Sequence, residues 1–333
     1  METRFLKSRL VRSARALLLS VPLAAGVATT PTLAAAPQKV VIYQAFQSLL
    51  YLPLYVGIDT GQFTKQGLDV QKVTAGSGAA GVSAVIGAHA TFSLQDPMIA
   101  VLANLKGATL TNVALVVNGA PVWIAVPGTS PVHKFSDLAG KTVATAIPPS
   151  TGTYLLERLL KRDKMKVTLD TVQLGTELAP LMAGRDQAAT LFEPQLDEAV
   201  AAGNRIVYAF TKHYPGGYAF STIDTLRSTV ASNPAMVQKF VAGLAAAEAL
   251  MHRSPKLAAT IAEREFPGLP KPVVQAAVAR MVALDVYPAG PAISPKAFAN
   301  ALSLQEYIGN IKPGQVSYSG TVDDRFAAAA GHQ

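Results

Sequence analysis

Short apolar segments alternate with longer amphipathic segments between residues 38 and 210. Glycine and proline separate the segments, and the short ones are rich in β-branched residues. This alternation predicts an α/β fold in which most strands are parallel. We expect strands at residues 40–43, 69–74, 92–95, 113–117, 122–126, 142–146, 171–174, 188–191 and 205–209. We expect helices between them at residues 51–63, 79–86, 152–161, 177–183 and 194–202.

Two interruptions divide the predicted elements into two lobes. Residues 118–121 (NGAP) break an apolar run, and residues 211–220 contain a Pro-Gly-Gly sequence. We interpret both as crossings, so that lobe 1 comprises residues 37–119 and 218–333 and lobe 2 comprises residues 120–217. Beyond the second crossing the chain is expected to be helical, at residues 234–252, 255–265, 271–284 and 295–308. Two α/β lobes joined by two crossings form a clamshell, and its cleft is a standard place for a small ligand.

Residues 1–36 have the pattern of a cleavable signal peptide. Five basic residues occur up to Arg15, an uncharged stretch rich in Ala and Leu follows, and Ala34 to Ala36 suit signal peptidase. A membrane anchor is the alternative, because no charge occurs between Arg15 and Lys39 and a span needs about 20 apolar residues. Proline, glycine and threonine dilute this stretch, which favours the signal peptide. The mature protein is then expected to begin near residues 35–37, outside the cytoplasmic membrane.

The formal net charge of +8 does not indicate a nucleic-acid-binding protein. The first 36 residues hold five basic residues and one acidic residue, which accounts for +4 of it. The remaining +4 is spread over almost 300 residues without a block of five like charges. The densest basic run, residues 161–166, is interpreted as the solvated end of a helix. Nucleic acid is therefore not an expected partner.

The absence of cysteine excludes several kinds of chemistry. With no cysteine the chain has no disulfide, thiolate zinc site, iron-sulfur cluster, cysteine nucleophile or lipid-carrying cysteine. Its five histidines lack metal-ligand spacing, and no G-x-S-x-G, P-loop or G-x-G-x-x-G motif occurs. We therefore expect no cofactor, no metal and no catalysis. A secreted chain without a lipid anchor is expected to diffuse freely in the periplasm of a two-membrane bacterium.

Residues 51–70 (YLPLYVGIDTGQFTKQGLDV) resemble the opening signature of the solute-binding proteins of nitrate, sulfonate and taurine ABC importers. That family shares a superfamily with thiamine-pyrimidine precursor proteins. The match lies in G-x-F-x-x-x-G-L-D-V at residues 61–70, and three further segments follow in the family's order: residues 76–78 (GSG), 135–141 (FSDLAGK) and 192–194 (FEP). The resemblance covers residues 38–310.

The resemblance implies a fold and a function. The fold is the two-lobed clamshell of a type II periplasmic binding protein, with two hinge crossings and a helical C-terminal tail. The function is capture of a small polar organic solute or oxyanion, of the sulfonate, taurine, nitrate or aminopyrimidine type, by closure of the cleft. The partners are the solute and the permease and ATPase of an inner-membrane ABC importer, and the protein itself is expected to be a monomer. The superfamily's enzymatic branch uses a cysteine-rich motif, which this chain lacks.

Two glycine-containing loops are candidates for ligand binding. Residues 76–78 and residues 150–152 each precede a predicted helix, one in each lobe. Backbone N–H groups at a helix N-terminus attract an anionic or carbonyl group, although ordinary strand-to-helix turns have the same sequence pattern. Donors from both lobes would let a bound solute stabilise the closed form.

Acidic, amide and aromatic side chains complete the candidate site. Asp96 either accepts hydrogen bonds from a ligand or caps its own helix. Glu193 either faces the cleft, where a carboxylate favours an amine, or is a first-turn charge stabilised by its helix. Together they favour a zwitterionic or amine-bearing ligand over nitrate. The candidate ligand contacts are Gln44, Phe46, Ser77, Gly78, Asp96, Asn118, Ser150, Thr151, Gly152, Glu193 and Tyr218. Further aromatic candidates, for which a core position is the alternative, are Tyr51, Trp123, Phe192 and Tyr214.

The sequence thus favours a periplasmic receptor that binds a solute and performs no reaction. A secreted sensory module that passes ligand information to a membrane partner is one alternative. A secreted transferase-type enzyme that uses the same cleft is the other, although no nucleophile and base at recognisable spacing support it.

Overall fold

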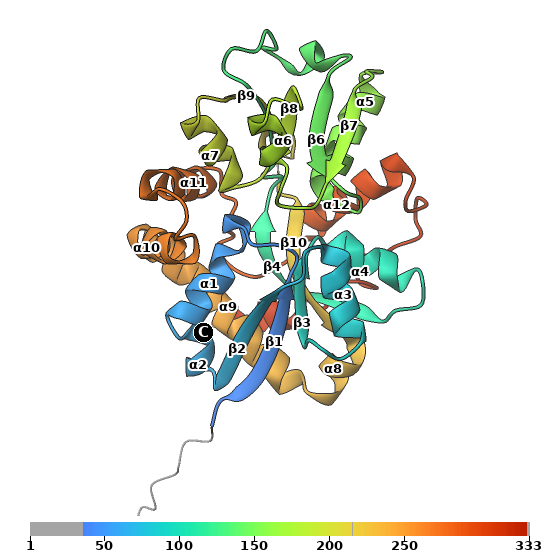
Figure 1. Ribbon diagram of the computed structural model, residues 1–333. Coiled ribbons are helices and arrows are strands. Elements are labelled where there is room, and N and C mark those ends of the chain that lie inside the picture. Colours follow the sequence, from blue (N-terminus) through green and yellow to red (C-terminus); the bar gives the residue numbers. More distant parts are fainter. Residues whose placement is uncertain (1–35, 215, 332–333) are drawn as a thin grey trace, which may run out of the picture. The chain divides into compact units, whose positions relative to one another are not determined.

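The computed structural model describes residues 36–214 and 216–331. The expected signal peptide therefore lies, except for Ala36, outside the described residues. Two five-stranded sheets organise this part of the chain, the second lying above the first in Figure 1. The first sheet has the strand order β2-β1-β3-β10-β4, and the second has the order β7-β6-β8-β5-β9.

The strands of the first sheet are β1 (Gln38–Gln44), β2 (Leu68–Thr74), β3 (Phe92–Gln95), β4 (Leu110–Asn118) and β10 (Ala219–Leu226). Those of the second are β5 (Trp123–Val126), β6 (Thr142–Ala146), β7 (Thr168–Val172), β8 (Ala188–Leu191) and β9 (Arg205–Ala209). Because the strands divide between the sheets at these positions, we propose the lobe boundaries given above, with residues 37–119 and 218–333 in lobe 1 and residues 120–217 in lobe 2.

Helices cover both sheets. Lobe 1 contains η1 (Leu49–Tyr51), α1 (Leu52–Asp59), α2 (Gln62–Lys65), α3 (Gly78–Ile86), α4 (Pro97–Asn104), α8 (Arg227–Ser232), α9 (Pro234–Arg253), α10 (Pro255–Glu265), α11 (Lys271–Ala283), α12 (Pro295–Ile308) and α13 (Arg325–Ala330). Lobe 2 contains η2 (Phe135–Leu138), α5 (Thr151–Arg162), α6 (Leu178–Met182), α7 (Gln195–Ala201) and η3 (Phe210–His213). In Figure 1, α10 and α11 flank one side of the molecule and α3 and α4 the other.

The α/β fold class with two lobes and a helical C-terminal part is confirmed, but the strands are less parallel than expected. Strand β1 pairs in parallel with β2 and β3, and β6 pairs in parallel with β7 and β8. By contrast, β5 is antiparallel to both β8 and β9. The strand expected at residues 171–174 is β7, which begins and ends earlier in the chain.

Strand β10 is the main element that the pattern did not predict. Residues 219–226 (AFSTIDTL) were expected to finish a crossing and lead into helices, yet they form a strand antiparallel to β3 and β4. The polar residues of this strand are buried and have partners on its neighbours. Thr222 donates to Asn112 at 2.7 Å, and Ser93 donates to Asp224 at 2.7 Å. Such a strand resembles a loop in sequence, because it is polar until the neighbouring strands satisfy it.

The long helix expected at residues 51–63 is divided into η1, α1 and α2. Gly61 has φ of +67°, the left-handed conformation that suits glycine, and it lies between the last two of these helices. After this turn the ring of Phe63 enters the core, where it leaves no room for a side chain at Gly57. A Cβ atom at Gly57 would lie 2.5 Å from the ring of Phe63. The turn is therefore held by packing as well as by backbone conformation.

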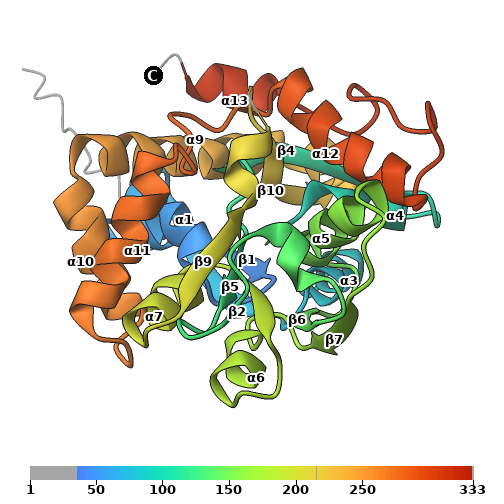
Figure 2. The same cartoon turned by 90° about the horizontal axis from the view of Figure 1, so that it is seen from above.

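The core of lobe 1 lies between the first sheet and α9. Phe240 of α9 stacks on Phe63 and on Phe92, with ring centroids 4.9 and 4.2 Å apart. Helix α9 also contacts α1, α2 and α13, and Figure 2 shows it running along the edge of the molecule beside α13. Within the described residues, no helix combines the length and the apolar character needed to span a bilayer.

Candidate ligand-binding pocket

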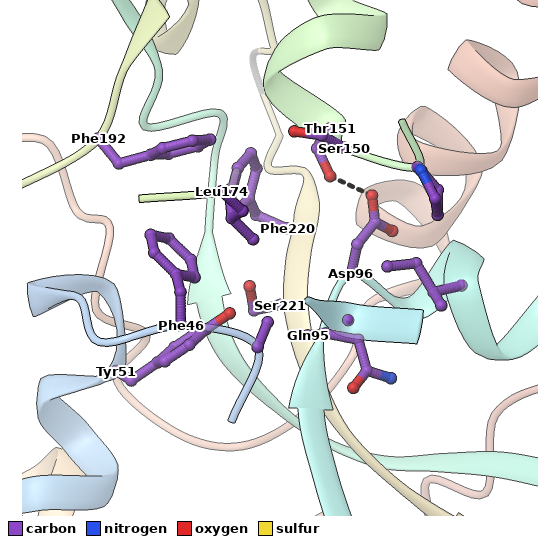
Figure 3. A pocket seen from close by; sticks show the side chains of 14 residues that line it. Phe46, Tyr51, Gln95, Asp96, Ser150, Thr151, Leu174, Phe192, Phe220 and Ser221 are labelled. Atoms are coloured by element: carbon purple, nitrogen blue, oxygen red, sulfur yellow. Dashed lines mark hydrogen bonds between the residues drawn. The ribbon is translucent and has the colours of Figure 1, made fainter. Parts of the chain in front are cut away.

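A pocket lies between the two lobes, where strand ends and helix beginnings of both meet (Figure 3). Its volume is about 30 Å³, which is room for a water molecule or two. The lining residues are Ala45, Phe46, Tyr51, Gly78, Gln95, Asp96, Ile99, Pro149, Ser150, Thr151, Leu174, Phe192, Phe220 and Ser221. The pocket is therefore narrow in this structure, with both lobes contributing to its wall.

Aromatic rings form one side of the pocket. Phe46 makes edge contacts with Tyr51 and with Phe192, at centroid distances of 5.6 and 5.5 Å, and Phe192 lies 6.1 Å from Phe220. Phe192 belongs to lobe 2 and the other three rings to lobe 1. Gly175 of lobe 2 also packs on Phe46, since a Cβ atom there would lie 3.3 Å from that ring. Residues of both lobes thus form a continuous apolar wall.

Asp96 and Thr151 form the opposite, polar side and join the lobes directly (Figure 3). Asp96 caps α4 by accepting a hydrogen bond from the backbone N–H of Met98 at 2.8 Å. Its other carboxylate oxygen accepts a hydrogen bond from the hydroxyl of Thr151, the first residue of α5. Burial raises the pKa of Asp96 to about 6, although both hydrogen bonds act to lower it. Asp96 therefore caps its helix and also lines the pocket.

Three more hydroxyls lie at the pocket, those of Tyr51, Ser150 and Ser221. Burial raises the pKa of Tyr51 well above its ordinary value, so that the phenol is neutral. Ser150 precedes α5 and makes no capping hydrogen bond with its side chain, unlike Ser77, which caps α3. These groups can donate or accept hydrogen bonds but carry no charge.

Five of the predicted contacts line this pocket: Phe46, Gly78, Asp96, Ser150 and Thr151. Tyr51 and Phe192, which were aromatic candidates with a core alternative, line it too. Sequence reasoning missed the others. Gln95 could have been found as the neighbour of Asp96, whereas Phe220 and Ser221 lie on the strand that was not predicted. Leu174 and Pro149 lie in lobe 2 loops and carry no chemical signal that marks a site.

The remaining six predicted contacts lie outside the pocket lining, and three of them make hydrogen bonds that support the structure around it. Gln44 is fully buried and accepts a hydrogen bond from the hydroxyl of Tyr55 at 2.9 Å. Ser77 accepts a hydrogen bond from the backbone of Ala80 at 3.2 Å. Asn118 accepts one from the backbone N–H of Tyr218 at 3.2 Å, which ties the two crossings together.

Tyr218 and Gly152 have packing roles. The Tyr218 side chain is fully buried, and its ring lies 4.7 Å from that of Tyr214. Gly152 lets α5 approach Phe192, because a Cβ atom there would lie 3.0 Å from that ring. Gly152 thus positions a lining residue without lining the pocket itself.

Glu193 does not face the pocket, and it forms part of a charge network between the lobes. Nε of Arg280, on α11 of lobe 1, lies 2.9 Å from Oε1 of Glu193, and Nη2 of Arg280 lies 2.5 Å from Oδ1 of Asp197 on α7 of lobe 2. Burial and the neighbouring Asp197 raise the pKa of Glu193, against the opposing charge of Arg280. The backbone carbonyl of Glu193 also accepts a hydrogen bond from the hydroxyl of Ser48 at 2.6 Å. The carboxylate of Glu193 also accepts a hydrogen bond from the backbone N–H of Asp197 at 3.1 Å, so the alternative expectation, a charge stabilised by the N-terminus of its helix, agrees with the structure.

Asp224 is a further buried acid, and it lies behind the pocket. Asp224 of β10 accepts hydrogen bonds from Ser93 and from the amide of Gln95, a lining residue. Burial raises the pKa of Asp224 to about 7, and these hydrogen bonds reduce the shift only in part. The described residues contain no group of three or more His, Asp or Glu side chains placed to hold a metal ion.

The stability of the protein is expected to fall between pH 5 and pH 8, because the folded protein holds the proton of Asp224 more tightly than the unfolded chain does. A raised folded pKa contributes stability below the unfolded pKa, and that contribution is lost as the pH rises through about 7. Asp224 alone should lower the free energy of unfolding by roughly 2 to 3 kcal/mol over this range. Urea unfolding at pH 5, 6, 7 and 8 measures the slope.

Asp224→Asn cannot titrate and should make this dependence shallower, leaving the part that comes from other buried acids such as Asp96 and Glu193. Asp285→Asn, at an exposed position, serves as the matched control and should retain the full dependence. Equal slopes in the Asp224→Asn protein and the wild type would contradict the assignment.

Solved structures of two solute-binding proteins and of one enzyme share this fold. The alkanesulfonate-binding protein SsuA from Xanthomonas axonopodis pv. citri, bound to MOPS, aligns with a TM-score of 0.71 and 19% identity over 87% of this chain and 100% of that one. The periplasmic nitrate-binding protein NrtA from Synechocystis PCC 6803 aligns with a TM-score of 0.69 and 13% identity over 89% of each chain. The desulfurization enzyme DSZB aligns with a TM-score of 0.66 and 12% identity over 89% of this chain and 99% of that one.

Comparison with family models identifies the family to which the chain belongs. No curated protein matches the chain by sequence. The family model described as "NMT1/THI5 like" matches residues 50–258, a range that includes every pocket-lining residue except Ala45 and Phe46. The match covers more than half of the chain, so this protein belongs to the NMT1/THI5-like family.

Proposed function

We propose that this protein is the substrate-binding component of an ABC importer, which captures a small solute by closing its lobes and delivers it to the permease. The observation that carries the proposal is a pocket whose wall comes from both lobes, which the hydrogen bond from Thr151 to Asp96 joins directly. A solute in this pocket touches both lobes at once. It therefore favours the closed form, which is the requirement for ligand-driven closure.

The size of the pocket supports a role for lobe motion. At about 30 Å³ it is smaller than an organic solute. A solute of several heavy atoms enters only when the lobes separate and the rings of Phe46 and Phe192 part, since these rings contact each other across the interface. The proposed contacts are the lining residues themselves, with the aromatic wall around the apolar part of the solute and Asp96, Ser150, Thr151 and Ser221 around its polar part.

The fold and the family agree with this role. SsuA and NrtA bind alkanesulfonates and nitrate according to their names, and both have this fold. We propose that this protein, like them, acts in the periplasm without catalysing a reaction, and that its partners are the permease and the ATPase of an importer. As a receptor of this kind it would act as a monomer, without a cofactor.

An enzyme that uses the same cleft is the second candidate, because DSZB shares the fold. The lining offers hydroxyls and one carboxylate, and none of the described lining residues is a histidine or a lysine that would act as a base for them. Turnover of any solute that binds would establish this candidate.

A thermal-shift screen of residues 37–333 tests the proposal, using sulfonates, taurine, nitrate, pyrimidines, aromatic acids and amines. A solute at 100 times its dissociation constant should stabilise the folded protein by about 2.7 kcal/mol. Ser150→Phe is expected to abolish the shift, because a ring at this buried position fills the pocket. Ser136→Phe, at an exposed position, is the matched control and should retain it. If no solute in the library stabilises the wild type, the proposal fails.

A further inference from the structure

We infer that the solute taken by this pocket is a small organic cation, whose charged nitrogen pairs with the carboxylate of Asp96 and whose apolar body lies against the aromatic wall. The inference rests on the proposed function and narrows its solute class. It stands on the composition and the geometry of the pocket lining.

The charge of the pocket is the first step. Asp96 is the one formally charged side chain among the described lining residues, which include no lysine, arginine or histidine. Its side chain is nearly buried, with 8% of the residue exposed. A solute in the pocket therefore meets a carboxylate without a neighbouring cation, and a bound cation would supply the missing countercharge.

The aromatic wall is the second step. Four rings, those of Phe46, Tyr51, Phe192 and Phe220, lie within 5.5 to 6.1 Å of their neighbours. Aromatic rings attract a cation held within about 6 Å of their faces, and the attraction grows when the site is dry. The same rings accept the apolar part of an amine. An inorganic anion would instead lose water against this wall without gaining a countercharge.

Three helices begin at the pocket, and their N-termini favour an anion, but two of them are already engaged. Asp96 itself caps α4, and Ser77 caps α3. Helix α5 has no side-chain cap, but its first residue, Thr151, is hydrogen-bonded to the carboxylate of Asp96, so an anion at this helix end would lie beside that negative charge. The partial positive charge of a helix end is about half an elementary charge, whereas Asp96 carries a full negative charge when ionised. An anion would bind well only to the protein in which Asp96 is protonated.

A change from neutral to acid pH should affect the affinity for a cation and the affinity for an anion in opposite directions. Burial raises the pKa of Asp96 to about 6, so that roughly nine in ten molecules have it ionised at pH 7 and one in ten at pH 5. The titratable groups that interact with Asp96 are the phenols of Tyr51, Tyr154 and Tyr218, which stay neutral in this range because burial raises the pKa of each. Asp224, behind the lining residue Gln95, has a pKa raised by burial to about 7, and its partial ionisation at pH 7 favours a cation in the same direction. Cation affinity should therefore fall about tenfold from pH 7 to pH 5, while anion affinity should rise.

Calorimetry of residues 37–333 with three probes of similar shape tests the inference: benzylamine, benzyl alcohol and benzenesulfonate, each at pH 5 and pH 7. Benzylamine should bind tightest and lose about tenfold in affinity at pH 5. Tighter binding of benzenesulfonate, strengthened by acid, would overturn the inference and leave the receptor proposal intact. Absence of benzylamine binding would also overturn it, whereas the receptor proposal fails only if the full library fails.

Two variants identify the group responsible. Asp96→Asn removes the charge but keeps a residue that caps helices well, so that α4 retains its N-cap. It should weaken benzylamine roughly 10- to 100-fold and remove most of the pH effect, leaving only the part due to Asp224. Thr151→Val removes the hydroxyl that donates to Asp96 but leaves the charge, and it should keep the pH effect. An undiminished pH effect in the Asp96→Asn protein would sink the inference, with circular dichroism confirming that both variants are folded.

Discussion

Phe240→Ala is expected to lower the free energy of unfolding by about 4 kcal/mol. The Phe240 side chain is fully buried on α9, and its ring stacks on Phe63 and on Phe92 of β3. Truncation would leave a cavity between the helix and the first sheet. The surrounding atoms cannot close that cavity easily, because α9 also packs on α1 and α13. Urea unfolding followed by far-ultraviolet circular dichroism measures the loss.

Phe266→Ala is the matched control for this substitution. Phe266 follows α10 and is only partly buried, so the same loss of atoms should cost roughly 1 to 2 kcal/mol. Equal losses at the two positions would show that the stack on Phe240 does not organise the core of lobe 1.

Arg280→Met is expected to lower the free energy of unfolding by about 3 kcal/mol. Arg280 faces two carboxylates of lobe 2, and the side chains of Glu193 and Asp197 are 0% and 5% exposed. Without the guanidinium, two buried acids remain side by side with no countercharge, and the protein must take up a proton or separate the lobes at this edge. The effect should therefore shrink in acid, which unfolding at pH 5 and pH 8 measures.

Arg264→Met provides the comparison. Arg264 pairs with Asp59 on the surface, where the two side chains are 59% and 35% exposed. Solvent screens such a pair, and its loss should cost no more than about 1 kcal/mol. A similar loss in the two variants would mean that the Arg280 network contributes no more than an ordinary surface pair.

The Arg280 network also lies at the edge where the two lobes contact each other. Glu193 follows directly after Phe192, a ring of the pocket wall, and its backbone carbonyl accepts hydrogen bonds from Ser48 and from the N–H of Leu49. The ion pairs, the backbone contacts and the aromatic wall therefore meet within a few residues. Any separation of the lobes at this edge would break all three, so under the proposed function the network would help to set the energy of the closed form.

Much of the fold was readable in the sequence because local signals agreed with it. Apolar runs such as residues 92–95 and 188–191 form strands with the expected bounds. Helices α9, α10 and α12 begin at the prolines that were expected to open them, since proline suits the first turn of a helix. Local signals also led to Gly78, Ser150, Thr151 and Asp96 as candidate contacts. These residues lie between a predicted strand and the helix that follows it, which is where ligands bind in folds of this class.

Tertiary structure alone decided the remainder. Strand β10 is polar in sequence, and its buried Thr222 and Asp224 are satisfied only by Asn112, Ser93 and Gln95 from strands far away in the chain. Glu193 looked like a ligand contact because its partner, Arg280, lies on a helix that follows lobe 2, and a sequence does not show which charges meet. The pocket itself combines rings and hydroxyls from both lobes. Local patterns determine the strands and helices, whereas a binding site depends on which distant surfaces those elements bring into contact.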